Sequence, residues 1–119
     1  MSDDRTHIDY VRDIVDELHR ILKFTKKKSY ESFSKDDKTI YAVIRSFEII
    51  GEAVKKIPQN IIGEFPDIPW KRMSGMRDKL IHEYFGVDIK TLWKTIQKRV
   101  PEAIPLAEEL LQELERKDD

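Results

Sequence analysis

Apolar residues recur every three or four positions along most of the chain, which is the spacing of one face of an α-helix. The first apolar stripe runs from Ile8 to Leu22 with charged residues between its members, and it predicts a helix that begins near Thr6. The hydroxyl of Thr6 can cap the first turn. The stripe fades in the lysine run 26–28, so a connection with at most one helical turn is expected around Phe33.

A second long stripe follows Asp36 and Asp37, either of which can cap a helix, and it continues to Ile57 before Pro58 stops it. Gly51 lies inside this stripe. A glycine within a helix costs about 1 kcal/mol relative to alanine. We therefore expect a neighbouring helix to approach closely at Gly51.

Three prolines and one glycine lie within residues 58–70 and interrupt any long periodic element, so a structured loop with a short turn is expected there. Helical spacing resumes from Lys71 to Tyr84, and Gly86 stands where a carboxyl-terminal cap belongs. Asp88 can cap the helix that follows.

The last apolar stripe contains Pro101, which is expected to break or kink a helix because proline removes a backbone hydrogen bond and crowds the preceding turn. A final helix then reaches Leu114, and a tail from about residue 115 is expected to fray. The sequence has no strand-like alternation, internal repeat or glycine-rich phosphate loop. The pattern therefore predicts one all-α domain over residues 1–119, an up-and-down bundle of four to five helices.

The charges nearly balance, with 22 Lys and Arg against 23 Asp and Glu, so binding to nucleic acid would have to come from a local patch. The absence of cysteine excludes disulfides, thiol nucleophiles and cysteine metal sites. The sequence opens without a signal-peptide pattern, and no apolar run approaches the roughly 18 to 20 residues of a membrane span. A cytoplasmic location, away from the membrane, is expected.

Arg77 is the most unusual residue of the chain, because helical spacing places it among the apolar side chains of Met73, Leu80 and Tyr84. A cation in such a stripe must extend outward, pair with an acid of another helix, or face a groove that receives an anion. Extension toward solvent, a buried ion pair and an anion site are therefore the three interpretations of Arg77.

His82 follows five positions later, about 140° around the helix axis from Arg77, so one straight helix does not easily aim both side chains at one atom. Three arrangements would bring them together: a cleft at the helix end, a local distortion, or a dimer in which both copies of the helix share a site. Asp78 lies four residues before His82, where it can orient the imidazole or raise its pKa. The other histidines, His7 and His19, are expected at the surface.

The pattern from Arg77 to Tyr84, in which Arg, a polar residue and three further residues precede His, one residue and Tyr, resembles the signature of the HEPN superfamily. The resemblance is strongest to the HepT-like toxin ribonucleases, and it extends from the first helix to about Pro105. It includes four further segments: 48–53, 66–70, 75–76 and 85–88. Many relatives carry asparagine where this chain has Asp78, although the superfamily pattern accepts other polar residues there.

The resemblance implies a metal-independent endoribonuclease without a cofactor, acting as a homodimer whose motif helices line one cleft. Arg77 and His82 would be its catalytic residues, and Asp78 a supporting one. It also implies the toxin of a type VII-like toxin–antitoxin system. A minimal nucleotidyltransferase antitoxin would neutralise the toxin by transferring AMP to Tyr84, and the two proteins can assemble into a larger hetero-oligomer.

The residue types suit this chemistry on their own terms. RNA supplies its own nucleophile, the 2′-hydroxyl, so a protein must remove that proton, stabilise charge on the phosphate and help the 5′-oxygen leave. A histidine such as His82, with a reference pKa near 6.5, serves as base or acid near neutral pH. Arg77 offers a permanent forked cation for phosphate oxygens. The products would be a 2′,3′-cyclic phosphate and a 5′-hydroxyl.

Basic residues near the motif helix are the expected RNA contacts outside the cleft, namely Lys71, Arg72 and Lys79. Other basic residues are candidates too, but most are expected to be simply solvated: Lys26, Lys27, Lys28, Lys55, Lys56, Lys98 and Arg99. Trp70 and Trp93 can stack on bases, although a core or dimer-interface role is favoured for both.

Two other interpretations of the sequence stay open. One is a catalytically silent helical module that binds a nucleotide or a partner protein, with Arg77 gripping a phosphate. The other is a purely structural bundle in which Arg77 forms an internal ion pair. RNA cleavage that depends on His82 separates the nuclease from both.

Overall fold

Six helices account for nearly all of the backbone that the computed structural model describes, residues 5–82 and 88–118, with side chains described for residues 5–76 and 88–117. Four of these helices are long: α1 (His7–Thr25), α3 (Asp37–Lys55), α5 (Trp70–His82) and α6 (Ile89–Asp118). Two are short: α2 (Tyr30–Ser34) and α4 (Gln59–Glu64). No strand occurs in these described ranges, so the all-α prediction is confirmed.

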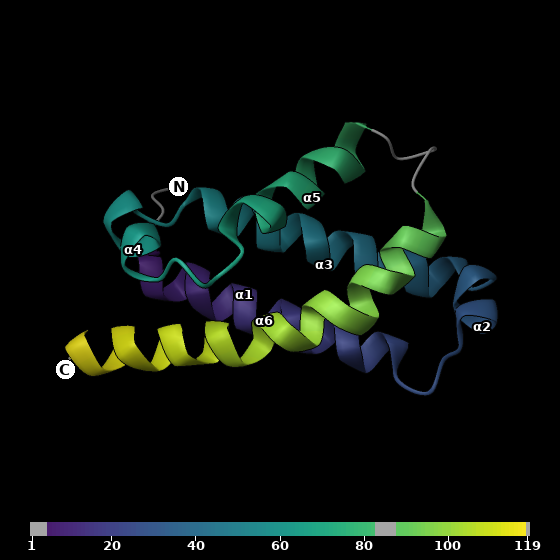
Figure 1. The fold of residues 1–119 in the computed structure, drawn as a ribbon, viewed down its shortest axis with the longest axis horizontal. Helices are drawn as coiled ribbons and strands as arrows, with labels where there is room; N and C mark the ends of the chain where they lie inside the picture. The colour runs from purple at the N-terminus through teal and green to yellow at the C-terminus, as the bar shows by residue number, and fades with distance from the viewer. Residues whose placement is uncertain (1–4, 83–87, 119) are drawn as a thin grey trace.

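The long helices run alternately in opposite directions, which confirms the up-and-down arrangement (Figure 1). Helix α3 packs between α1 and α5, and α1 packs between α3 and α6. Helix α2 closes one end of the bundle by contacting α3 and α6. The main partner of α5 is therefore α3, and the carboxyl end of α5 and the start of α6 lie at the same end of the molecule (Figure 1).

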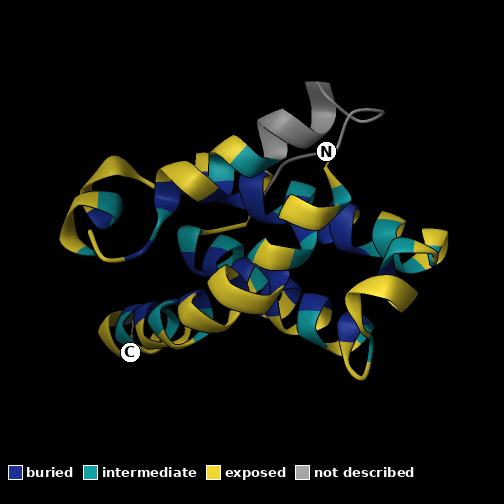
Figure 2. Cartoon of the chain, turned by 45° about the vertical axis from the view of Figure 1, so that its right-hand side comes forward, coloured by how far each residue is buried: buried dark blue, intermediate teal, exposed yellow. Residues whose placement is uncertain are grey.

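The buried apolar side chains form one cluster that draws on every long helix. Their three-and-four spacing turns each stripe inward, and Figure 2 shows the resulting alternation of buried (dark blue) and exposed (yellow) positions along the helices. Phe33 anchors α2 in this core: it is fully buried, and its ring lies 5.0 Å from that of Trp93 on α6. The predicted connection around Phe33 thus contains its helical turn.

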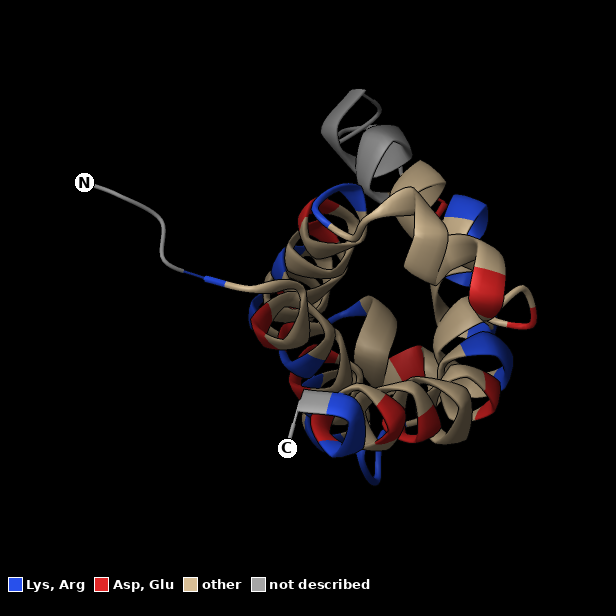
Figure 3. Ribbon diagram, turned by 90° about the vertical axis from the view of Figure 1, so that its left-hand side faces the viewer, with Lys and Arg blue, Asp and Glu red and all other residues tan. Residues whose placement is uncertain are grey.

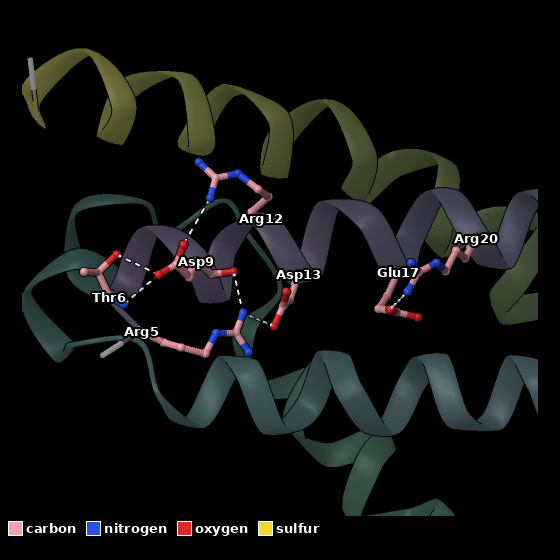
Figure 4. A network of polar contacts seen from close by, with 7 residues as sticks. All are labelled: Arg5, Thr6, Asp9, Arg12, Asp13, Glu17 and Arg20. Carbon is pink, nitrogen blue, oxygen red and sulfur yellow. Dashed lines mark hydrogen bonds and ion pairs between the residues drawn. The ribbon is translucent and has the colours of Figure 1, made fainter. Parts of the chain in front are cut away.

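Polar contacts fix the first turn of α1 (Figure 4). The Thr6 backbone N–H donates to the Asp9 carboxylate at 2.9 Å, and Thr6 is the N-cap of a helix whose first residue is His7, as the predicted start near Thr6 required. This backbone hydrogen bond is the main reason why the pKa of Asp9 is lowered. Arg12 donates to Asp9 at 3.1 Å and to Glu115 of α6 at 3.1 Å, so the same network joins the two helices.

Asp36 is the cap of α3, where the sequence left a choice between two aspartates. Its carboxylate accepts from the Thr39 backbone N–H at 3.2 Å and from the Thr39 hydroxyl at 2.7 Å. The Lys28 ammonium lies 2.7 Å from the same carboxylate. Together these contacts, the Lys28 bond first, hold the pKa of Asp36 far below its usual range.

Helix α6 continues through Pro101 and Pro105 and is 30 residues long. The prediction of a separate last helix after Pro101 is therefore wrong, whereas the predicted kink is present. Figure 1 shows the helix changing direction near its middle. An unbroken buried stripe explains the continuity, because its members keep helical spacing on both sides of the prolines: Ile96, Val100, Ala103, Ala107, Leu110 and Leu114. The helix also continues to Asp118, past the expected start of fraying at about residue 115.

Smaller differences concern the ends of elements. Helix α3 ends at Lys55, and Ile57, assigned to that helix by periodicity, is buried just after it. Helix α5 begins at Trp70 and is described to His82, so the predicted cap at Gly86 lies outside the described residues.

Gly51 is buried in α3, the helix that packs against both α1 and α5. None of the helices described is both long and apolar enough to span a bilayer.

Replacing Asp36 with asparagine should lower stability in a pH-dependent way. A carboxylate whose pKa is lowered by folding stabilises the fold above its unfolded pKa of about 4, and this contribution is lost as the pH falls toward the folded-state pKa. In urea denaturation, the difference in unfolding free energy between wild type and Asp36→Asn should be full at about pH 7 and smaller at about pH 3. Asp37→Asn, which changes an exposed neighbour in the first turn of α3, is the control. An equal, pH-dependent loss in that control would contradict the assignment.

Candidate functional site

The segment with the candidate chemistry belongs to α5, whose start is firmly attached to the preceding loop. The Trp70 indole N–H donates to the Phe65 carbonyl at 3.0 Å, and the Trp70 side chain is only 7% exposed. The Met73 backbone N–H donates to the Pro69 carbonyl at 3.0 Å, which forms the first turn. Because α5 also packs along α3, the direction in which it carries its later residues is fixed by the core.

Four predicted site residues, Arg77, Asp78, Lys79 and His82, lie in the last two turns of α5. The helix is uninterrupted from Arg77 to His82, so a break in the helix between these two positions is excluded. The Cα atoms of Arg77 and His82 are separated by about 7.5 Å along the helix axis and about 140° around it. The side chains of these four residues, and the whole of Tyr84, lie outside the described part of the structure.

The His82 side of α5 can be followed backward along the helix through described residues. At three- and four-residue spacing, the positions that share it are Lys71, Gly75, Asp78 and His82. Lys71 and Gly75 are exposed, and a Cβ atom added at Gly75 would meet nothing within 4 Å. This side of α5 is therefore open where the structure describes it, and no described neighbour requires a glycine at position 75.

Lys71 and Arg72, predicted to contact RNA, are both exposed in the first turn of α5. Neither has a carboxylate partner among the residues whose side chains are described. The first turn of α5 also contains no acidic residue. The beginning of this helix therefore presents cations to solvent, although their contact with RNA stays a prediction.

A hollow of about 50 Å³ separates α5 from α6. Its floor comes from α1 and α3, and arginines from both flanking helices, Arg72 and Arg99, border it. The remaining lining residues are mainly apolar: Leu18, Phe47, Ile50, Pro69, Met73, Met76, Thr95, Val100 and Ala103. Arginine does not give up its proton near neutral pH, so none of these groups is suited to proton transfer. The hollow is a packing feature of the bundle and not a second catalytic centre.

The tryptophans have the structural role that was favoured for them. Trp70 belongs to the core, and Trp93 packs against the buried ring of Phe33. Of the two histidines expected at the surface, His19 is about half exposed and has its Nε2 atom 3.6 Å from a carboxylate oxygen of Glu108. His7 is partly exposed at the first turn of α1, at the opposite end of the molecule from the carboxyl end of α5 (Figure 1).

Two basic residues that the sequence analysis did not single out, Lys90 and Lys94, lie exposed at the start of α6. Together with Lys98 they recur every four residues, and this periodicity was the signal that could have identified them. As for metal sites, no group of three or more His, Asp or Glu side chains in the described part of the chain is arranged to hold an ion.

Comparison with known proteins places these features in a family. The family model described as "Ribonuclease HepT-like" matches residues 14–110, which include α3 and α5. A protein from Thermococcus cleftensis named "Probable ribonuclease HepT" is 50% identical over 97 residues, covering 82% of this chain and 88% of its own length.

Two further relatives have names that assign them provisionally to the RNases. One, from Methanocaldococcus jannaschii, is 46% identical over 110 residues, covering 92% of this chain and 91% of its own length. The other, from Caldanaerobacter subterraneus, is 45% identical over 103 residues, covering 87% of this chain and 92% of its own length. No solved structure matches the chain. The extent of these matches shows that the chain belongs to the HepT-like ribonuclease family.

Proposed function

We propose that this protein is a metal-independent endoribonuclease that acts as a homodimer, with Arg77 and His82 as its catalytic residues. The observation that carries the proposal is the family match, which spans residues 14–110 and so includes the whole segment from Arg77 to Tyr84. The names of the relatives, which describe ribonucleases, support the same reaction class.

The proposed reaction uses the 2′-hydroxyl of RNA as the nucleophile. One imidazole removes the hydroxyl proton, and the oxygen attacks the adjacent phosphorus. Arg77 neutralises charge on the non-bridging oxygens, and a second imidazole protonates the departing 5′-oxygen. The bond from phosphorus to that oxygen breaks, which leaves a 2′,3′-cyclic phosphate and a 5′-hydroxyl. Asp78, one helical turn before His82, would orient the imidazole.

A dimer supplies the two imidazoles and brings them to a common phosphate. Two observations support this arrangement. The uninterrupted α5 helix holds Arg77 and His82 about 140° apart around its axis, so a single copy does not easily direct both at one atom. Gly75 lies on the His82 side of the helix with nothing within 4 Å of an added Cβ, which leaves room for a second helix to approach.

Tyr84 is proposed as the residue through which the activity is regulated. In this toxin–antitoxin hypothesis, a minimal nucleotidyltransferase transfers AMP from ATP to the Tyr84 hydroxyl and releases pyrophosphate. The added phosphate would place bulk and negative charge two residues beyond His82, in competition with the RNA phosphate. The antitoxin would then be the natural protein partner of the chain, with RNA as its substrate.

Cleavage of RNA in EDTA should depend on both proposed catalytic residues. His82→Ala and Arg77→Ala should each slow cleavage by at least about 100-fold, the usual cost of losing a general acid–base group or an anion-stabilising group. The products should carry 2′,3′-cyclic phosphate and 5′-hydroxyl ends. His19→Gln, which alters a surface histidine paired with Glu108, should leave the rate unchanged. An inactive wild-type dimer that still binds RNA would favour the catalytically silent module instead.

Bulk placed at Gly75 should weaken the dimer without unfolding the subunit. A Cβ added at the exposed Gly75 meets nothing within 4 Å, and leucine is a better helix former than glycine, so Gly75→Leu should not unfold the subunit. Sedimentation velocity should show dissociation at concentrations where wild type is dimeric, together with lower nuclease activity. Gly63→Leu is a matched control, because an added Cβ there also meets nothing within 4 Å. A monomeric wild-type protein with full activity would refute the shared-site mechanism.

Incubation with the cognate nucleotidyltransferase and ATP should add AMP to Tyr84 and suppress RNA cleavage. Intact-mass spectrometry should detect the addition on wild type and on Tyr30→Phe, which changes an exposed tyrosine of α2. Tyr84→Phe should not be modified, and its cleavage should resist the transferase. Modification of Tyr84→Phe to the wild-type extent would show that another residue accepts the nucleotide.

A further inference from the structure

The two halves of α6 carry opposite charge. Residues 89–101 include three lysines and one arginine and no acidic residue. Residues 102–118 contain six acidic residues and only two basic ones. The chain as a whole is nearly neutral, so this division is local to one helix.

Several acidic residues of the second half form ion pairs within the molecule. Glu108 lies 3.6 Å from His19, and Glu115 lies 3.1 Å from Arg12, so both bind α6 to α1. Glu113 pairs with Arg116. Figure 3, which faces the end of the bundle that carries both chain termini, shows acidic and basic segments lying next to one another there.

The lysines of the basic half lack such ion pairs in the described part of the chain. Arg99 is 3.6 Å from Glu102, but Lys90, Lys94 and Lys98 are exposed and have no carboxylate partner among the described residues. Their spacing of four residues places them in one row on the side of α6 opposite its buried stripe. The row spans about 12 Å along the helix axis.

This row opposes the stability of its own helix. Lysines four residues apart repel each other on a helix surface. Lys90 also stands in the first turn of α6, where the helix dipole favours an anion over a cation, and the Asp88 carboxylate there is engaged as the helix cap by the Lys90 and Thr91 backbone N–H groups. No contact among the described residues explains the row, and an external ligand with a linear series of negative charges would relieve its repulsion.

We propose that Lys90, Lys94 and Lys98 form a track that binds the phosphate backbone of the RNA beyond the cleavage site. Three ammonium groups spaced evenly over about 12 Å can each contact a phosphate of one strand. The track starts at the end of the molecule where α5 carries Arg77 and His82 (Figure 1). The proposal rests on the proposed ribonuclease function, and it names the part of the protein that holds substrate outside the reacting phosphate.

Binding can be measured apart from cleavage with a 2′-O-methyl RNA 20-mer, because this probe lacks the attacking hydroxyl. The triple variant Lys90→Gln, Lys94→Gln, Lys98→Gln should bind it about tenfold or more weakly at low salt, with a slope of log K against log salt reduced by about 2. Lys55→Gln, Lys56→Gln, Lys117→Gln is the control. It removes the same charge at the opposite end of the bundle and should change neither quantity (Figure 1).

The track and the nuclease can fail separately in this design. A wild-type protein that binds the probe through the track but cleaves no RNA refutes the nuclease and leaves the track standing. If wild type cleaves RNA and the triple variant binds the probe as the control does, the track is overturned. Dissociation of the dimer in the triple variant, with an unchanged salt slope, would also overturn it and would assign the row to a protein interface. In cleavage assays the variant should raise KM for long RNA and leave cleavage of a dinucleotide unchanged.

Discussion

The geometry of α5 is the constraint on which the functional interpretation depends. A helix that runs without a break through Arg77 and His82 holds the two residues on different sides of one rod. The structure shows no break between the two positions, so a cleft at the helix end, a distortion short of a break, and a second subunit are the ways of joining them. Gly75 is exposed on the histidine side, and an added Cβ there would meet nothing within 4 Å, which favours the second subunit.

In the described part of the chain, α5 is supported mainly along the face that packs on α3. Its partner is α3, and its first turn is fixed by the hydrogen bond of the Trp70 indole and by the Pro69 carbonyl. Helix α6, the next element in the chain, packs instead on α1. A helix held along one face and open along another suits a surface that a second protein or a substrate must reach.

Helix faces and caps were the most predictable part of this protein. Periodic apolar residues located all four long helices, and polar residues that can cap a helix marked the starts of three of them, with caps at Thr6, Asp36 and Asp88. Such features depend on residues within one turn of each other, which a sequence displays directly. The continuity of α6 across Pro101 was not predictable in the same way, because the stabilisation of the continuous helix comes from packing on other helices.

The row of Lys90, Lys94 and Lys98 was missed for a different reason. It stands out only when the structure shows that these lysines have no carboxylate partner among the described residues. The candidate catalytic residues were proposed from the motif and its family resemblance, and the family is confirmed while their roles stay predictions.

The bend in α6 gives this helix two separable tasks. The acidic half of α6 is held against α1 by ion pairs with Arg12 and His19. The basic half extends from it at an angle set where Pro101 and Pro105 interrupt the backbone hydrogen bonds of the helix. The prolines thus set the angle between the two halves of α6, and in the proposed track this angle would set the direction from which a bound strand approaches.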